Sequence, residues 1–381
     1  MPMPCLARVF VALCKMLAGP VGLLLRHRLF PACFSIFSQP MRIPDTSSST
    51  FKACIFGAGA IGGWMGAALA RAGCELSAVA RGATLQALRT NGLELVDEGG
   101  RQRFALRAES EPEALGVQDL VVISVKAPGL ADVARRIAPL IGPQTLVLTA
   151  MNGVPWWFLQ AGVAAELRGR RLTSVDPQGS IAAAMPEKQV IGAVVHASCS
   201  LDAAGVVRRH FGNTLILGEP LAEAGQPLTP RLEALTDLLV RGGIDARAST
   251  HIQRDAWYKL WGNMTMNPIS ALTGATTDTI LGDELVRDLV TRVMLEAKSI
   301  GERLGLPIAE TPEDRHAVTL RLGAFKTSML QDVEAGRPVE LDALVGAVRE
   351  LGQICAMDTP FTDALLGLTR LRVRELGLLP R

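Results

Sequence analysis

The sequence predicts an α/β domain over residues 51–248, followed by an all-α domain over residues 249–381. A glycine-rich turn at residues 57–62 joins a short apolar run to an alanine-rich helical segment. Two further apolar runs of strand type follow at the spacing of βα units, which is typical of a parallel sheet. Beyond His251 the apolar residues recur with the helical period, which indicates an all-α half.

Length and charge restrict the class of protein. A chain of 381 residues can form two domains with a substantial core. Lys and Arg total 39 while Asp and Glu total 37, so the net charge of +2 gives no reason to expect nucleic acid as a partner. The seven cysteines form no C-x-x-C pair and no His-spaced metal pattern. They fit reduced thiols, and we expect a cytoplasmic protein without a bound metal.

The first fifty residues differ from the rest of the chain. No acidic residue precedes Asp45. The apolar run over residues 9–25 is shorter than the roughly 20 residues of a spanning helix and is interrupted by Lys15, so we expect no firm membrane association. A signal or transit peptide and an interfacial helix remain alternatives. We favour a dispensable, poorly ordered extension, because Met41 precedes a Ser/Thr-rich linker.

The glycine-rich turn has the context of a dinucleotide-binding loop. An apolar run over residues 51–56 precedes it, and an alanine-rich helical segment to about Arg71 follows it. The first glycine permits a tight turn, the second lets the backbone approach a pyrophosphate, and the third permits close packing of helix on strand. The phosphates are expected at the positive end of the helix. A Rossmann-type domain is therefore predicted, with the loop Gly57-Ala58-Gly59-Ala60-Ile61-Gly62.

The end of the second predicted strand indicates which dinucleotide is bound. That strand covers residues 74–80 and is followed by Arg81. An NAD site would place an acidic residue here to hold the ribose 2′-hydroxyl, and the nearby Glu75 lies at the wrong end of the strand. A guanidinium suits a 2′-phosphate through forked hydrogen bonds. We therefore expect NADP(H), with an ordinary exposed loop cation as the alternative for Arg81.

Two more predicted strands, residues 119–125 and 145–150, end at Lys126 and just before Asn152. Ligands of an open parallel sheet lie outside the carboxyl ends of its strands, so both side chains are expected near cofactor or substrate. Ordinary turn chemistry is the alternative for the Asn-Gly pair at Asn152. Residues 180–218 are β-rich and are expected to extend the sheet in antiparallel fashion; His196 within them is interpreted as structural. A helix at residues 231–241 and a strand at residues 244–248 close the domain.

Three polar residues recur at every fourth position in the first helical segment of the second half: Lys259, Asn263 and Asn267. On an α-helix this spacing places them on one face, among residues of buried type. Buried amides and ammonium groups need partners, because an unsatisfied polar group costs a few kcal/mol. Two interpretations are open for this face. Either the lysine extends its ammonium to solvent and the two core asparagines are hydrogen-bonded within the protein, or the three groups are a row of donors that faces a ligand.

Later helical segments add polar groups to an apolar pattern. Apolar stripes are predicted at Leu285, Leu289, Val293, Ala297, Ile300 and Leu304, and at Leu344, Val348, Leu351 and Cys355. Residues 324–332 form a helical run with a hydroxyl pair, and residues 336–342 form a turn that leads into a helix. Glu340 in that turn either complements the positive end of the helix or is directed at Lys259.

Together these segments resemble the ketopantoate reductase (2-dehydropantoate 2-reductase) family from about Phe51 nearly to the C-terminus. The motifs that carry the resemblance are the glycine loop, Val125-Lys126-Ala127, Asn152-Gly153, the helix from Lys259 to Asn267-Pro268, Ser328-Met329-Leu330-Gln331-Asp332 and Glu340-Leu341-Asp342. The Lys-x-x-x-Asn-x-x-x-Asn-Pro helix followed by Ser-Met-Leu-Gln-Asp is fairly specific, whereas the glycine loop alone is not.

The resemblance implies that NADPH delivers hydride to the ketone of a 2-keto acid, most simply ketopantoate in pantothenate and coenzyme A biosynthesis. Lys259 would be the general acid, and Glu340 would bind a substrate hydroxyl and compensate the ammonium. The expected partner is a small 2-keto acid, with a homodimer allowed. Substrate binding is implied for Asn263, Asn267 and Ser328, a place at the hydride-transfer site for Asn152, and cofactor binding for Lys126 and Arg81.

Two departures from the family keep the substrate open. Thr277 occupies the place where family members often carry an asparagine, and the pair Trp156-Trp157 follows the Asn152 loop, where it would shape or occlude the pocket. A reductase of a different 2-keto or 3-hydroxy acid is therefore the second hypothesis. A non-catalytic NADP-binding sensor is the third, although it leaves Lys259 and Glu340 without a task.

Overall fold

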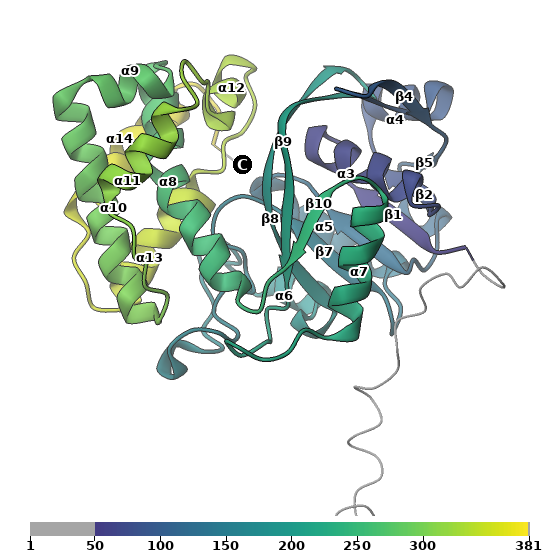
Figure 1. The fold of residues 1–381 in the computed structure, drawn as a ribbon, viewed down its shortest axis with the longest axis horizontal. Coiled ribbons are helices and arrows are strands. Elements are labelled where there is room, and N and C mark those ends of the chain that lie inside the picture. Colours follow the sequence, from purple (N-terminus) through teal and green to yellow (C-terminus); the bar gives the residue numbers. More distant parts are fainter. Residues whose placement is uncertain (1–49, 380–381) are drawn as a thin grey trace, which may run out of the picture. The chain divides into compact units, whose positions relative to one another are not determined.

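The computed structural model describes residues 50–379. The predictions for residues 1–49 lie outside the described residues. Within residues 50–379 an α/β half precedes an all-α half, in the order that the sequence predicts (Figure 1). None of the described helices is long and apolar enough to span a membrane.

The α/β half is built on one mixed sheet, which has ten strands within the described part of the chain. The strands follow the order β4-β3-β9-β8-β7-β6-β1-β2-β5, and β10 pairs with β9. From β8 to β5 all neighbours are parallel. The bounds are β1 Lys52–Phe56, β2 Glu75–Val79, β3 Leu93–Asp97, β4 Gly100–Phe104, β5 Arg107–Glu109, β6 Leu120–Ile123, β7 Leu146–Ala150, β8 Val190–Ala203, β9 Val206–Gly218 and β10 Asp245–Ala248.

The central strands form because their residues are apolar on both faces. Every residue of β6 and β7 is buried, as expected for parallel strands covered on two sides. Helix α3 packs on β1, β3 and β9, and α7 lies beside it. The helices of this half are α3 Ala60–Arg71, α4 Gly82–Asn91, α5 Leu130–Arg136, α6 Ser180–Ala184 and α7 Pro230–Arg241.

The β8–β9 hairpin corrects part of the sequence prediction. Strand β8 pairs in parallel with β7, and only β9 is antiparallel to β8. Residues 180–184 form helix α6 instead of strand. The long connection between β7 and β8 permits a parallel return, which the local pattern of residues does not reveal. Strands β3, β4 and β5 were not predicted; β4 is almost wholly exposed, so it carries no alternation of buried and exposed residues.

The all-α half surrounds helix α8, which contacts α10, α12 and α14. The predicted stripe on α10 is wrong at Leu285, which is 77% exposed, while Val290 and Met294 take core positions. The predicted second stripe is buried at all four positions. The bounds are α8 Ile252–Thr273, α9 Thr277–Gly282, α10 Glu284–Leu304, α11 Pro312–Leu320, α12 Ser328–Glu334, α13 Ala347–Ile354 and α14 Pro360–Glu375.

Helix α8 continues past Pro268, although a proline inside a helix removes one backbone donor. Pro268 and its neighbours from Met264 to Ala271 are buried, so tertiary packing maintains the helix. The helix ends where Gly274 adopts a left-handed conformation with φ of +77°.

The loop that follows β7 connects the two halves. Six of its residues enter the apolar core of the all-α half: Val154, Phe158, Leu159, Val163, Leu167 and Leu172. Both halves belong to one compact unit. The domain boundary at residue 248 stays a prediction. The apolar core of the all-α half also includes residues that precede position 248 in the sequence.

Candidate active site

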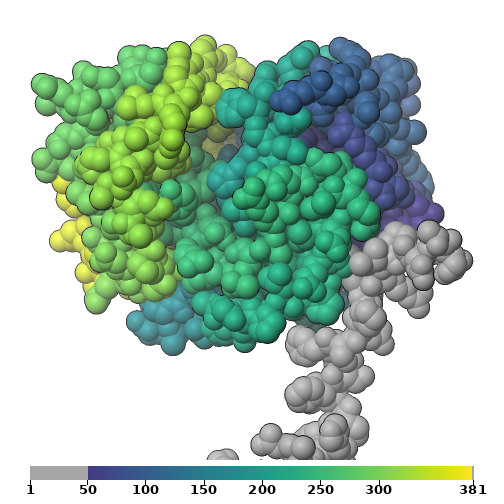
Figure 2. Space-filling model, viewed as in Figure 1, coloured from purple at the N-terminus to yellow at the C-terminus, as the bar shows by residue number. Residues whose placement is uncertain are grey.

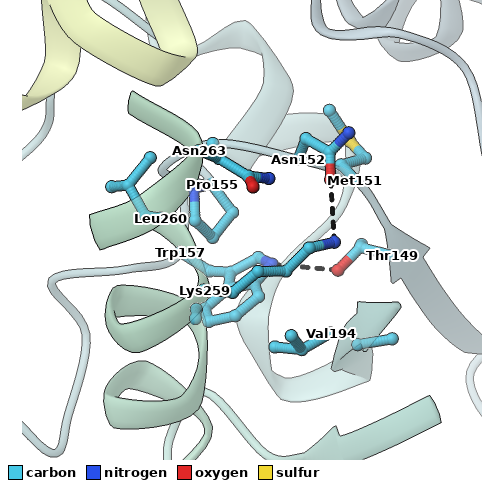
Figure 3. Close-up of a pocket in the computed structure, with 12 residues that line it drawn as sticks. Thr149, Met151, Asn152, Pro155, Trp157, Val194, Lys259, Leu260 and Asn263 are labelled. Carbon is cyan, nitrogen blue, oxygen red and sulfur yellow. Dashed lines mark hydrogen bonds between the residues drawn. The ribbon is translucent and has the colours of Figure 1, made fainter. Parts of the chain in front are cut away.

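A pocket lies between the carboxyl end of β7 and helix α8, and Lys259 enters it from the helix (Figure 3). The Lys259 Nζ donates a hydrogen bond of 2.8 Å to Oδ1 of Asn152. The structure thus brings together two residues that are 107 positions apart in the chain. The lining is Thr149, Met151, Asn152, Gly153, Pro155, Trp157, Ala193, Val194, Ala256, Lys259, Leu260 and Asn263.

The environment of Lys259 favours release of its proton. Burial lowers the pKa of Lys259 to about 8, against the nearby charge of Glu340, which acts to raise it. An ammonium with this pKa is largely charged at neutral pH and gives up its proton more readily than a surface lysine. Such a group at the edge of a pocket is suited to general acid catalysis.

Trp157 forms a fixed wall of the pocket. Its Nε1 donates a hydrogen bond of 3.0 Å to Oγ1 of Thr149. The indole lies over Gly192, where a Cβ would come within 2.5 Å of the ring. Trp156 is also buried, but it is absent from the lining. Of the predicted tryptophan pair, one residue therefore shapes the pocket.

The three polar residues of α8 have different surroundings. Asn263 lines the pocket beside Lys259. Asn267 is buried outside the pocket: its Nδ2 donates to Asn263 O at 3.0 Å, and its Oδ1 accepts from Ser328 Oγ at 3.1 Å and from Met329 N at 3.3 Å. Asn267 therefore joins α8 to the first turn of α12, and the Ser328 hydroxyl is directed at that amide.

Glu340 lies at the junction of the two halves. Its Oε1 accepts a hydrogen bond of 3.0 Å from the Ala127 backbone N–H, which follows β6. Burial raises the pKa of Glu340, against the hydrogen bond from Ala127 and the charge of Lys126. Among residues 50–379 the carboxylate forms no ion pair with Lys259, so its direct contact is a backbone amide and its effect on Lys259 is through charge.

Lys126 contacts a carboxylate from the other half of the molecule. Its Nζ forms an ion pair with Asp332 of α12, which also accepts a hydrogen bond of 3.0 Å from Arg337 Nε. Asp332 is almost fully buried and thus joins the end of β6 to α12. Asp332 ends the Ser-Met-Leu-Gln-Asp motif, for which the sequence predicts no role at this position. Its signal was a carboxylate one helical turn after Ser328.

The glycine loop has the geometry that a dinucleotide requires. Gly57 has φ of +100°, and its carbonyl accepts a hydrogen bond of 2.8 Å from Ser124 Oγ. At Gly62 a Cβ would lie 2.2 Å from that hydroxyl, so only glycine fits. In the described part of the chain, no heavy atom lies within 4 Å of the Cβ position at Gly59, and no side chain caps the start of α3. The open backbone and free helix N-terminus fit a pyrophosphate.

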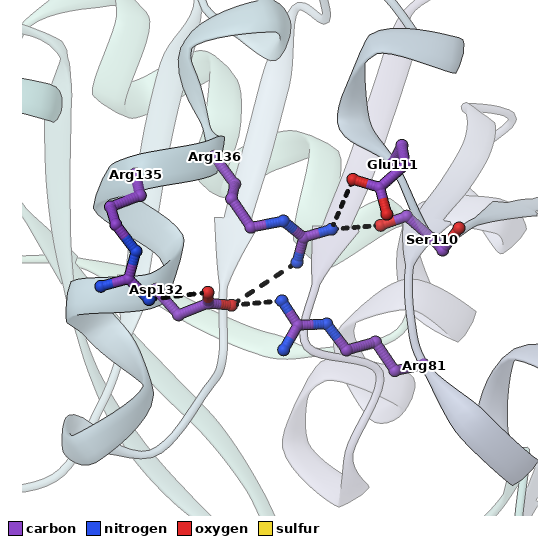
Figure 4. Close-up of polar contacts among 6 residues, drawn as sticks. All are labelled: Arg81, Ser110, Glu111, Asp132, Arg135 and Arg136. Carbon is purple, nitrogen blue, oxygen red and sulfur yellow. Dashed lines mark hydrogen bonds and ion pairs between the residues drawn. The ribbon is translucent and has the colours of Figure 1, made fainter. Parts of the chain in front are cut away.

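Arg81 lies two residues after the end of β2, at the carboxyl edge of the sheet, and its guanidinium is exposed (Figure 4). It pairs with Asp132 of α5, which also contacts Arg135 at 3.0 Å and Arg136 at 3.5 Å. Three guanidinium groups therefore surround one shared carboxylate, with Glu111 at the rim. The excess positive charge of this cluster suits a phosphate. The ion pair with Asp132 fixes the position of the Arg81 guanidinium.

Thr277 is outside the pocket. Its Oγ1 donates to Gly323 O at 2.8 Å, and its backbone N–H donates to Phe325 O at 3.1 Å. Thr277 was expected to alter one substrate contact, but its hydroxyl holds the loop before α12. Any effect of Thr277 on the substrate is therefore indirect. His196 of β8 is exposed, and it is absent from the lining of the Lys259 pocket.

Comparison with known proteins places these residues in one family. A family model described as ketopantoate reductase PanE/ApbA matches residues 53–221, and its C-terminal counterpart matches residues 251–373. The 2-dehydropantoate 2-reductase of Mesorhizobium japonicum is 45% identical over 327 residues, which are 86% of this chain and 99% of the relative.

Solved structures show the same architecture. A candidate ketopantoate reductase from Ralstonia solanacearum MolK2 is 52% identical, with a TM-score of 0.82 over 87% of this chain and 100% of that chain. The 2-dehydropantoate 2-reductase of Geobacter metallireducens is 26% identical, with a TM-score of 0.73 over 84% of this chain and 100% of that chain. The predicted fold class and family resemblance are confirmed.

Proposed function

The chain belongs to the ketopantoate reductase PanE/ApbA family, and on this premise we propose that it reduces 2-dehydropantoate to pantoate with NADPH. The observation that carries the proposal is the pair of Lys259 and Asn152 at 2.8 Å, beside a pocket at the carboxyl edge of the sheet. A lysine of lowered pKa and a glycine-rich loop thus lie at the same edge of the sheet, which is the edge where an α/β sheet binds its ligands. The reaction would serve pantothenate biosynthesis.

The cofactor would bind across the carboxyl edge of the sheet. Gly57, Gly59 and the start of α3 would hold the pyrophosphate, with Ala58, Ala60, Ile61 and Gly62 completing the loop. Arg81 would bind the 2′-phosphate, which is the reason to favour NADPH over NADH. When bound, the reduced nicotinamide supplies the hydride. Lys126 and Asn152 lie at the ends of β6 and β7, on the side of the sheet that the cofactor would occupy.

Lys259 would act as the general acid. Addition of hydride to the ketone carbon turns the carbonyl oxygen into an alkoxide, which takes a proton from Nζ and leaves the neutral amine to recover one from solvent. The hydrogen bond to Asn152 holds the ammonium in place for this transfer. Glu340 helps to keep Lys259 protonated before the transfer, because its charge opposes the effect of burial.

Substrate contacts would come from both sides of the pocket. Asn263 can reach the substrate from α8, one helical turn after Lys259. Ser328 begins α12 and would contact substrate while Asn267 positions its hydroxyl. The carboxylate of Glu340 would accept a hydrogen bond from a substrate hydroxyl. A homodimer stays a prediction.

The direct test measures oxidation of NADPH with 2-dehydropantoate by wild type, Lys259→Ala and the control Lys188→Ala, in which the lost lysine is exposed. Removal of a general acid usually costs about 10²–10⁴-fold in rate. We expect this loss for Lys259→Ala alone. If the variant retained more than about a tenth of the wild-type rate, the general-acid role would be wrong.

Two observations favour a second candidate, a reductase of another 2-keto or 3-hydroxy acid. Thr277 is directed at Gly323 and lacks the reach of the asparagine that family members often have there. Trp157 also gives the pocket a rigid aromatic wall. A panel of keto acids with NADPH would separate the candidates. Equal or greater efficiency on another acid would replace 2-dehydropantoate as the substrate.

A further inference from the structure

Arg315, on helix α11, is a guanidinium without a carboxylate partner among residues 50–379. Its Nε is buried and makes no hydrogen bond. The carboxylate of Glu310 lies near the hydroxyl of Tyr258 and forms no ion pair with Arg315. Burial lowers the pKa of Arg315, so the surroundings do not favour its charge. Arg315 is half-buried as a residue, but a buried polar atom such as its Nε usually has a hydrogen-bond partner, and the described part of the chain does not supply one.

Helix α8 makes room for this guanidinium. Arg315 lies against the backbone of Gly262, where a Cβ would come within 2.6 Å of Nη2 and 2.8 Å of Nε. Its Cζ is 5.9 Å from the centre of the Tyr258 ring. A glycine inside a helix costs about 1 kcal/mol relative to alanine. Helix α8 therefore has a residue of low helix propensity at the position where the guanidinium packs against its backbone.

The guanidinium packs on helix α8, one turn from Lys259 and outside the lining of the Lys259 pocket. Gly262 and Lys259 are three residues apart on α8, so they are neighbours on its surface. Partial desolvation and the charges of Lys259, Arg315 and Arg247 lower the pKa of His196 on β8 to about 4. Both Lys259 and Arg315 thus act on the same side chain of β8. Figure 2 shows the hollow between the helical half and the sheet half.

The pocket itself lacks a second cation for the carboxylate of a keto acid. Lys259 is the one cationic side chain in its described lining, and it is needed as the proton donor. The Ser328 hydroxyl donates its one hydrogen to Asn267, so it can accept a hydrogen bond from a substrate hydroxyl but cannot donate one to a carboxylate. We propose that Arg315 binds the carboxylate of the 2-keto acid and so makes the enzyme select acids over neutral ketones, an inference that rests on the proposed reduction of a 2-keto acid. A planar guanidinium matches a carboxylate through two parallel hydrogen bonds.

The test compares Arg315→Met and Arg315→Lys with the control Arg254→Met, in which the lost guanidinium is exposed on α8. Steady-state rates are measured with 2-dehydropantoate and with its neutral amide. Loss of a hydrogen bond to a charged group should lower kcat/KM for the acid by about 10- to 100-fold, mostly through KM. The rate with the amide should hardly change. The lysine variant should recover part of the loss, because it keeps the charge without the fork.

A second variant separates carboxylate binding from a merely structural role. Gly262→Ala improves helix propensity, so α8 should still form, but its Cβ must displace the guanidinium. It should lower kcat/KM for the acid by about 5-fold or more in the wild type and by less than about 2-fold in the Arg315→Met background. Additive losses, or equal losses for acid and amide, would overturn the proposal.

Calorimetric titration of the keto acid into each NADPH complex distinguishes failure of this inference from failure of the proposed function. If wild type turns over keto acids and Arg315→Met behaves like Arg254→Met, the carboxylate role is wrong while the reductase activity stands. If wild type turns over none of them but binds the acid, weaker binding by Arg315→Met still supports the role of Arg315. If wild type does not bind the acid, both proposals fail.

Discussion

Lys259 acquires its chemistry from its surroundings. An exposed lysine has a pKa near 10.4, whereas burial lowers the pKa of Lys259 to about 8. The charge of Glu340 limits this decrease, and Asn152 orients the ammonium through a hydrogen bond of 2.8 Å. Asn263 and Asn267 show the same dependence, since both are amides on one helix face while one lines the pocket and the other holds α12.

The pKa of Lys259 predicts the pH dependence of reduction. A general acid acts in its protonated form, so kcat/KM should fall as the pH rises through about 8. Lys259→Arg keeps a positive charge but holds its proton at every pH in the range, so its low residual rate should lose this decline. The measurement is kcat/KM from pH 6 to 10 for both proteins. Identical profiles would assign the decline to another group.

Arg81 allows a second prediction at the scale of one residue. Arg81→Ala should weaken binding of NADPH far more than binding of NADH, because only NADPH carries the 2′-phosphate. Arg107→Ala removes an exposed guanidinium from β5 and serves as the control. Fluorescence titration gives both dissociation constants. Equal losses for the two cofactors would mean that Arg81 does not bind the phosphate, and its pair with Asp132 would then be structural.

At the scale of an element, the β1–α3 turn combines a tightly packed glycine with an exposed one. Gly62 lies against Ser124 and the Gly57 carbonyl, whereas Gly59 has open space around its Cβ position. A methyl group at Gly62 meets backbone that cannot move without opening the turn. A methyl group at Gly59 fills only the space where the pyrophosphate would lie. Substitution of Gly62 should therefore lower the stability of the fold, whereas substitution of Gly59 should weaken cofactor binding.

We expect Gly62→Ala to destabilise the protein by about 1–3 kcal/mol, as overpacking usually does. Gly59→Ala should leave the free energy of unfolding nearly unchanged while it weakens cofactor binding, because its φ of −80° suits alanine. Urea unfolding and cofactor titration of both variants give the two quantities. A Gly59→Ala protein that bound cofactor as tightly as wild type would contradict a phosphate site at this turn.

At the scale of the whole molecule, contacts between the two halves define the cleft. Lys126 pairs with Asp332, Ala127 N–H donates to Glu340, and Phe211 packs edge-on against Phe325 at 5.8 Å. Farther along, the loop after β7 is fixed to α13, where Glu350 accepts from the backbone and hydroxyls of Thr173 and Ser174 at 2.6–2.8 Å. These contacts fix the position of the Lys259 helix relative to the sheet that carries the glycine loop.

Glu350 offers a test of this link. Partial burial acts to raise its pKa, but the hydrogen bonds from Ser174 and Thr173 outweigh it, so the net shift is downward. A carboxylate with a lowered pKa stabilises the fold above its unfolded pKa, and that contribution is lost as the pH falls through the folded value. Glu350→Gln should cost about 1 kcal/mol at pH 7, less than for a buried site because of solvent screening, and less again in acid.

The measurement is the free energy of unfolding at pH 7 and at pH 3.5, with Glu375→Gln at the exposed end of α14 as the control. A cost for Glu350→Gln that did not shrink in acid would show that the carboxylate charge is not what stabilises the loop.

Local signals determined much of this protein before any tertiary contact was considered. The strand, glycine turn and helix of the dinucleotide loop are contiguous, and the face shared by Lys259 and Asn263 follows from helical spacing alone. The parallel central strands were recognised because burial on both faces makes them continuous apolar runs.

Only the tertiary structure decided which of these polar groups meet. Contacts between residues far apart in the chain decide the parallel return of β8, the bond of Asn267 to α12, the backbone contact of Glu340 and the packing of Arg315 on Gly262. Periodicity tells which face a side chain occupies, but the partner on that face is set by long-range packing. For that reason the sequence by itself predicted a dinucleotide-binding fold with a polar helix face at Lys259, and the packed structure decided which groups line the pocket beside it.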